Sequence, residues 1–113
     1  MRAEADDGRK VKVELLYFDG CPSYAELLPA LRELLASKGI QQEVELRRVE
    51  TPEEAERERF LGSPTVRIDG EDVDPTAKER EEFGMECRLY RTEQGLVRTP
   101  PETWIRAALD RAG

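Results

Sequence analysis

The sequence predicts an α/β fold in which a mixed sheet of four to five strands is flanked by helices, in the order β-α-β-α-β-β-α. Three observations carry this prediction. The patterned part of the chain opens with a nearly continuous apolar run, and apolar stripes at helical spacing follow it and close the chain. Short strand-like segments bounded by glycine or proline lie between these stripes.

Length and charge limit the classes of protein. The chain has 113 residues, the size of one domain, and we expect residues 11–113 to form that domain. With 25 acidic and 18 basic residues the net charge is −7, which argues against a nucleic-acid partner. Residues 1–10 are polar, so we expect a disordered tail without a signal or an anchor. These features favour a cytoplasmic protein that does not bind membranes.

The first half of the predicted domain begins with a strand and a helix. Residues 11–18 form the apolar run, which is typical of a central strand covered on both faces. Pro22 suits the first position of a helix, which makes Cys21 the expected N-cap. Leucines at helical spacing predict a helix over residues 24–38, and Gly39 ends it.

Two strands and a short helix are expected in the middle of the chain. Residues 43–50 alternate enough to predict a second strand. Residues 51–54 read Thr-Pro-Glu-Glu, a capping box that starts a helix ending near residue 59 or 60. Residues 65–68 predict the third strand, and the pair Asp69-Gly70 is typical of a hairpin turn.

The last third of the chain is expected to complete the sheet. Residues 71–86 form a strongly charged insertion with one or two helical turns. Residues 87–91 predict the fourth strand, and residues 96–98 its continuation or a fifth. A second capping box at residues 99–102 starts a terminal helix. One face of this helix is apolar and consists of Trp104, Ile105, Ala108, Leu109 and Ala112.

Cysteine is the residue type that offers reactive chemistry in this chain. Cys21 and Cys87 are the only cysteines and histidine is absent, which excludes a histidine-based mechanism. At a helix N-terminus, the helix dipole and free N–H groups, here those of Ser23 and Tyr24, favour a thiolate. Asp19 acts in the opposite direction through its charge. Cys21 is therefore the candidate nucleophile.

Three motifs resemble a known family. Residues 16–22 (LYFDGCP), 60–66 (FLGSPTV) and 87–90 (CRLY) resemble small bacterial thioredoxin-family proteins of the thioredoxin-like superfamily. The resemblance covers about residues 11–113. It implies a thioredoxin-like fold with a redox cysteine at Cys21 and a cis peptide bond before Pro64. A dithiol motif has its second cysteine three positions after the first, where this chain has Tyr24.

The resemblance also implies a function. Cys21 is expected to be the nucleophile of a thiol–disulfide oxidoreductase, acting on a protein disulfide or a low-molecular-weight thiol such as glutathione. A cis peptide bond at Pro64 implies a groove for such a substrate beside Cys21. We expect no cofactor and no metal ion. The expected substrate-binding residues are Pro22, Ser23, Tyr24, Ser63, Pro64 and Thr65.

Cys87 has two expected placements. In the usual topology of the superfamily it lies at the end of the sheet far from Cys21, as an inert or buried thiol. The insertion at residues 71–86 is also long enough to double back and deliver Cys87 to Cys21 as a resolving thiol. A redox-inactive binding or adaptor module is the alternative function, and a soft-metal site formed by the two thiols is the third.

Overall fold

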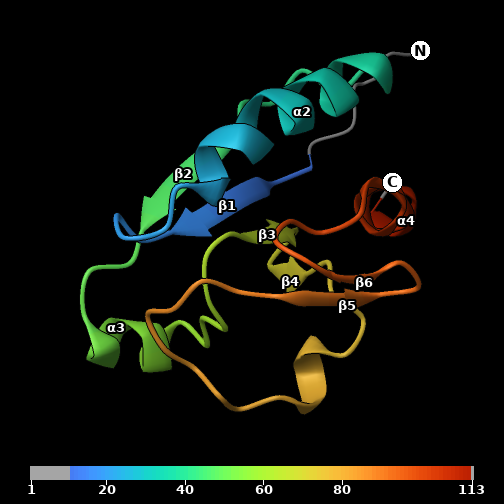
Figure 1. Ribbon diagram of the computed structural model, residues 1–113. Coiled ribbons are helices and arrows are strands. Elements are labelled where there is room, and N and C mark those ends of the chain that lie inside the picture. Colours follow the sequence, from blue (N-terminus) through green and yellow to red (C-terminus); the bar gives the residue numbers. More distant parts are fainter. Residues whose placement is uncertain (1–10, 113) are drawn as a thin grey trace.

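The computed structural model describes residues 11–112 of the chain (Figure 1). Residues 1–10, where we expect the polar tail, lie outside the described part. Within the described range no helix is long and apolar enough to cross a membrane. The elements are β1 (Val13–Tyr17), α2 (Ser23–Ser37), β2 (Glu45–Arg48), α3 (Pro52–Arg57), β3 (Thr65–Ile68), β4 (Glu71–Asp72), the 3₁₀ helix η1 (Ala77–Glu79), β5 (Tyr90–Thr92), β6 (Gly95–Val97) and α4 (Glu102–Ala112).

The central sheet is mixed and has four strands in the order β2-β1-β3-β4. β1 runs parallel to β2, with Leu15 opposite Leu46, and antiparallel to β3, with Leu15 opposite Val66. The first four residues of β1 are buried, as the unbroken apolar run predicts for an inner strand. The predicted mixed α/β architecture, with helices beside a mixed sheet, is confirmed.

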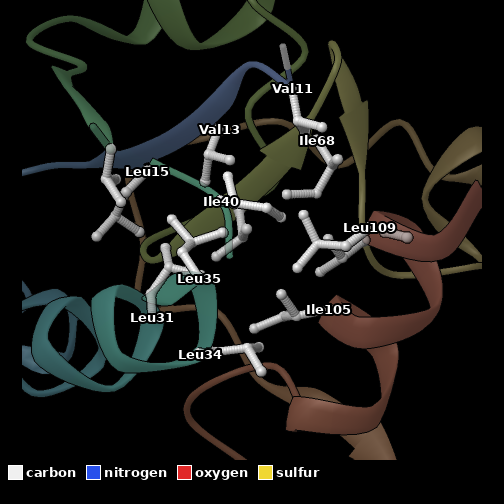
Figure 2. Close-up of a cluster of buried hydrophobic side chains, with 14 of the residues drawn as sticks. Val11, Val13, Leu15, Leu31, Leu34, Leu35, Ile40, Ile68, Ile105 and Leu109 are labelled. Atoms are coloured by element: carbon white, nitrogen blue, oxygen red, sulfur yellow. The ribbon is translucent and has the colours of Figure 1, made fainter. Parts of the chain in front are cut away.

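Side-chain alternation along β1 separates two apolar clusters. Val13 and Leu15 belong to the larger cluster, in which side chains of β1, α2, β3 and α4 meet (Figure 2). Leu16 points to the other face and packs with Ala55 of α3 and with Phe60. The sheet therefore has α2 and α4 on one face and α3 on the other.

The fourth strand of the central sheet corrects the prediction for residues 71–86. This strand, β4, lies inside the segment expected to be an insertion. Asp69 and Gly70 have positive φ angles of 52° and 85°, and this tight turn brings β4 directly against β3. The predicted strands at 87–91 and 96–98 do not extend this sheet, because β5 and β6 pair with each other as a separate ribbon. The helical turn expected in the insertion is η1.

The start of α2 differs from the prediction by one residue. The helix begins at Ser23 and its N-cap is Pro22, so Cys21 is not the cap. Pro22 already has near-helical backbone angles (φ −79°, ψ −6°). Its carbonyl accepts a hydrogen bond from the Ala25 N–H at 3.0 Å, so the hydrogen bonding of the helix starts at Pro22 and not at Cys21. Gly39, with φ +73°, follows the helix end as predicted.

The cap of α3 and the buried face of α4 follow the sequence predictions. Thr51 Oγ1 accepts a hydrogen bond from the Glu54 N–H at 3.0 Å, while the Glu54 carboxylate accepts from the Glu50 N–H at 2.9 Å. α3 then ends at Arg57, two or three residues earlier than expected. The apolar face predicted for α4 is confirmed, since its buried residues are Ile105, Ala108 and Leu109, and Trp104 and Ala112 pack against the same cluster.

Candidate functional site

Cys21 occupies the turn between β1 and α2. Its N–H donates to the Phe18 carbonyl at 3.3 Å, which closes the turn, and the side chain is only 1% exposed. The backbone of Ser23, the first residue of α2, acts to lower the pKa of Cys21 through a hydrogen bond. The thiol therefore lies beside the positive end of a helix, as expected, but beneath the surface rather than on it.

The loop before β3 forms the wall opposite this turn. The Cys21 thiol donates a hydrogen bond to the Ser63 carbonyl oxygen, at 3.5 Å, and a longer one to the Ser23 hydroxyl, at 3.9 Å. The peptide bond between Ser63 and Pro64 is cis, the conformation that the resemblance implies. The Ser63 side chain is fully buried, and among the described residues its hydroxyl has no hydrogen-bond partner.

Cys87 is brought to Cys21 by backbone pairing with Ser63. The Ser63 N–H donates to the Glu86 carbonyl and the Arg88 N–H donates to the Ser63 carbonyl, both at 2.8 Å. These two bonds form a parallel bridge between Ser63 and Cys87. The bridge places Cys87 beside Ser63, whose carbonyl oxygen accepts a hydrogen bond from the Cys21 thiol, and interaction between the two thiols shifts the pKa of both. Of the two placements that the sequence leaves open, the structure has the one beside Cys21.

The two thiols differ in exposure and in acidity. Both are free, but Cys21 is buried whereas Cys87 is exposed. Burial acts to raise the pKa of Cys21, but hydrogen bonds from Cys87, Ser23 and Ser63 outweigh it and the pKa is lowered. The same contact with Cys21, together with burial, raises the pKa of Cys87. The first negative charge of the pair therefore resides on the Cys21 sulfur.

An ion cluster that sequence reasoning missed anchors the segment that carries Cys87. Arg88 is 2% exposed and donates to both carboxylate oxygens of Asp72, at 2.7 and 3.2 Å. It also donates to the Asp74 carboxylate at 3.1 Å and to Thr65 Oγ1 at 2.9 Å. We call Arg88, Asp72 and Asp74 the Arg88 clasp. It connects the residue after Cys87 to β3, to β4 and to the residues that follow β4.

Tyr90 extends this anchor into the core. Its ring lies 4.4 Å from the Arg88 guanidinium and 6.0 Å from the ring of Trp104, and its hydroxyl donates to the Pro64 carbonyl. Burial raises the pKa of Tyr90 far above its ordinary value, so the phenol remains a donor. Clasp and tyrosine together hold Cys87 on one side and Pro64 on the other. Arg88 and Tyr90 lie in the motif at residues 87–90 that the resemblance uses, but sequence reasoning assigned neither of them a role.

The expected substrate-binding residues fall into two groups. Ser63, Pro64 and Thr65 are buried, and Thr65 Oγ1 donates to the Gly62 carbonyl at 2.6 Å, so Thr65 turns inward instead of flanking a surface. Pro22 is exposed, and Tyr24 is half-buried and stacks on Tyr17 with 4.0 Å between ring centroids. A third expected residue of that turn, Ser23, is buried against Cys21.

Asp19 takes a different role from the expected one. Its carboxylate pairs with Arg48 at 3.1 Å on the surface of the sheet end. Within residues 11–112 no group of three or more cysteine, aspartate or glutamate side chains is arranged to hold a metal ion. The two sulfur atoms are then the whole donor set available to the soft-metal alternative.

Comparison with known proteins adds no identification. A scan against protein-family models found no match, and searches of curated proteins and of solved structures found none either.

Proposed function

We propose that this protein is a thiol–disulfide exchange protein of the thioredoxin-like class, in which Cys21 and Cys87 alternate between a dithiol and a disulfide. The observation that carries the proposal is that two cysteines from distant parts of the sequence meet at Ser63. The Cys21 thiol donates to the Ser63 carbonyl at 3.5 Å, and Cys87 forms a backbone bridge with Ser63. This placement supplies the second thiol that the segment after Cys21 lacks, because a serine and a tyrosine follow Pro22.

The exchange is a two-electron transfer between sulfur atoms. Oxidation of the protein dithiol forms one sulfur–sulfur bond between Cys21 and Cys87, and one sulfur–sulfur bond of the substrate disulfide breaks. The two protons of the protein thiols pass to the two substrate thiols that are released. A protein disulfide or a small disulfide such as that of glutathione supplies the matching half of the reaction.

Hydrogen bonds around Cys21 support this chemistry. A thiolate is the form of cysteine that attacks a disulfide and the form that leaves one. Hydrogen bonds from the Cys87 thiol and the Ser23 backbone act to lower the pKa of Cys21, which favours its thiolate. Ser63 adds a buried hydroxyl that lacks another partner among the described residues and that assists ionisation. Cys21 is thus an acceptor surrounded by donors.

The fold assignment within this proposal rests on the strand arrangement. β1 ends at the turn that carries Cys21, and β3 is antiparallel to β1 and starts directly after Ser63 and Pro64. This placement of a cysteine and a proline on neighbouring strand ends is what the resemblance to thioredoxin-like proteins implies.

A redox titration tests the proposal. The protein is equilibrated with mixtures of reduced and oxidised glutathione, quenched with acid and alkylated, and each cysteine is followed by peptide mass spectrometry. We expect Cys21 and Cys87 to lose alkylation together and a linked peptide pair to appear. Cys87→Ser is the matched control, because it leaves Cys21 without an internal partner and abolishes the linked pair. Two thiols that stay reduced in the most oxidising mixture refute the proposal.

One observation favours the alternative of a redox-inactive binding module. Leu89, two residues after Cys87, is 50% exposed, and Leu96 of β6 is 58% exposed. These two side chains offer apolar area for contact with a partner. On this alternative the cysteines only pack, and the glutathione titration finds no linked peptides.

A further inference from the structure

We infer that every exchange with an external sulfur atom passes through Cys87, and that Cys21 reacts only within the protein. This inference rests on the proposed function and reverses the sequence expectation that Cys21 attacks the substrate. Cys87 is then the sulfur that carries the mixed disulfide. Cys21 is the internal thiol that opens and closes the protein disulfide.

Access to the two sulfur atoms is the first step of the argument. A disulfide exchange needs the attacking sulfur to approach along the line of the bond that breaks, so the accessible sulfur is the one that reacts. Cys21 is 1% exposed, with Ser63 on one side and Ser23 on another. Cys87 is exposed although its neighbour Arg88 is buried. Cys87 is therefore the cysteine that an external disulfide approaches in the folded protein.

The anchoring of Cys87 is the second step. A mixed disulfide at Cys87 is resolved quickly only if this residue stays against Cys21 while the substrate is attached. The two backbone bonds of Ser63, to Glu86 and from Arg88, hold it there. The Arg88 clasp holds the next residue from the interior side. The surface side of Cys87 is left free for the substrate.

The reaction then has two defined steps. The Cys87 thiolate attacks a substrate disulfide, forms a bond to one substrate sulfur and releases the other as a thiolate that takes up a proton. The Cys21 thiolate next attacks the Cys87 sulfur, which forms the internal disulfide and releases the second substrate thiolate. In the reverse direction an external thiolate attacks Cys87, and Cys21 leaves as the thiolate that Ser23 and Ser63 stabilise.

Single-cysteine variants test this order of events. Cys21→Ser and Cys87→Ser proteins are mixed with glutathione disulfide above neutral pH, and mixed-disulfide formation is timed by intact mass. We expect Cys21→Ser to accumulate glutathione on Cys87. In Cys87→Ser the reaction at Cys21 waits for local opening and is at least about tenfold slower. In denaturant the two variants should react at similar rates, which shows that burial causes the difference.

Two controls make the test decisive. Cys21→Ala, which also fits the buried site, repeats the measurement if serine disturbs the packing. If folded Cys87→Ser reacts at Cys21 as fast as Cys21→Ser reacts at Cys87, the proposed order of the two steps is wrong. The proposed function then still stands, provided that the wild type forms its linked disulfide. Absence of the linked disulfide in the wild type overturns both.

Discussion

Ser63 bonds to the Cys21 thiol through its carbonyl, and its side chain acts on the acidity of the same sulfur. Its carbonyl accepts a hydrogen bond from the Cys21 thiol at 3.5 Å, and its hydroxyl, fully buried, has no partner among the described residues but lowers the pKa of Cys21 as a donor. An unpaired buried hydroxyl is costly while Cys21 is a neutral thiol. A charged Cys21 sulfur is a stronger acceptor for this hydroxyl than a neutral thiol is. Ser63 therefore links the charge of one sulfur atom to the hydrogen bonding of the core.

Replacing Ser63 by alanine should raise the pKa of Cys21 with little loss of stability. The variant removes a donor to the thiolate, whereas in the thiol form it removes only an unpaired polar group. The measurement is the ultraviolet absorbance of the thiolate as a function of pH in the reduced protein. Ser37→Ala is the matched control, because the Ser37 hydroxyl donates to the Leu34 carbonyl at the far end of α2. Identical titrations of Cys21 in both variants contradict the role given to Ser63.

Replacing Arg88 by methionine should destabilise the protein strongly. The variant removes the buried cation from Asp72 and leaves Asp74 with its longer ion pair to Arg80, at 3.4 Å, and loss of one partner of a buried pair costs about 3–5 kcal/mol. The free energy of unfolding of the reduced protein in urea measures this. Arg48→Met is the control, since that arginine is 48% exposed and surface ion pairs of this kind contribute little to stability.

The same substitution should also slow formation of the internal disulfide. With the clasp broken, Cys87 spends less time against Cys21, so linked peptides accumulate more slowly in folded protein. Arg88→Lys keeps the charge but not the paired contact with Asp72, so its rate of disulfide formation should lie between those of the wild type and Arg88→Met. Arg88→Lys replaces Arg88→Met in the test if the methionine variant does not fold. Disulfide formation at the wild-type rate in folded Arg88→Met shows that the clasp does not position Cys87.

Acid should weaken the clasp through Asp74. Burial acts to raise the pKa of Asp74, but hydrogen bonds from the backbone and hydroxyl of Thr76 and the charge of Arg88 outweigh it and lower the pKa. A carboxyl whose folded pKa is depressed stabilises the protein above its unfolded value, about 3.9, and this contribution is lost as the pH falls through the folded value. The stability of the wild type should therefore fall steeply below about pH 4.

Unfolding in urea over a series of acidic pH values measures this slope. Asp74→Asn should be less stable at neutral pH and should show a shallower decline in acid. Asp110→Asn is the control, because Asp110 forms an exposed pair with Lys38 and should keep the wild-type slope. An unchanged slope in Asp74→Asn rules out this carboxylate as a source of acid sensitivity.

Local sequence patterns predicted the elements that surround Cys21. The apolar run before the cysteine, the leucine stripe after it and the glycine at the helix end are short-range signals, and the structure has the strand and helix where they indicate. The approximate start of β3 after Pro64 was predictable in the same way. The burial of Cys21 was not, because it depends on Ser63 and Cys87, which reach it from other parts of the chain.

The placement of Cys87 was left open for a related reason. Arg88 pairs with Asp72 and Asp74. Because 38% of the residues are charged, no local pattern distinguishes these three from the other charged residues. β4 was missed because a strand of two residues has no periodicity of its own. Its position follows from the Asp69-Gly70 turn, which was recognised, but the length of the strand that the turn starts is set by the clasp and by β3.

Replacing Gly62 by alanine should disturb the pairing that holds Cys87. Gly62 has a φ of +129°, a backbone conformation that residues with a side chain rarely adopt. A Cβ added to Gly62 lies 2.8 Å from the Glu86 carbonyl oxygen and 3.0 Å from the Arg88 Cβ. Glu86 and Arg88 are the residues on either side of Cys87 that bond to Ser63. A methyl group at residue 62 therefore pushes on the segment that presents Cys87.

Gly84 supplies the matched control for this variant. It lies in the same approach to Cys87, its N–H donates to the Phe60 carbonyl at 3.0 Å, and an added Cβ meets no atom within 4 Å. We expect Gly62→Ala to lose more than about 1 kcal/mol of stability and to form the Cys21–Cys87 disulfide more slowly. Gly84→Ala should change neither quantity measurably. If both variants behave alike in urea unfolding and in the timed formation of linked peptides, the close approach at Gly62 does not set the position of Cys87.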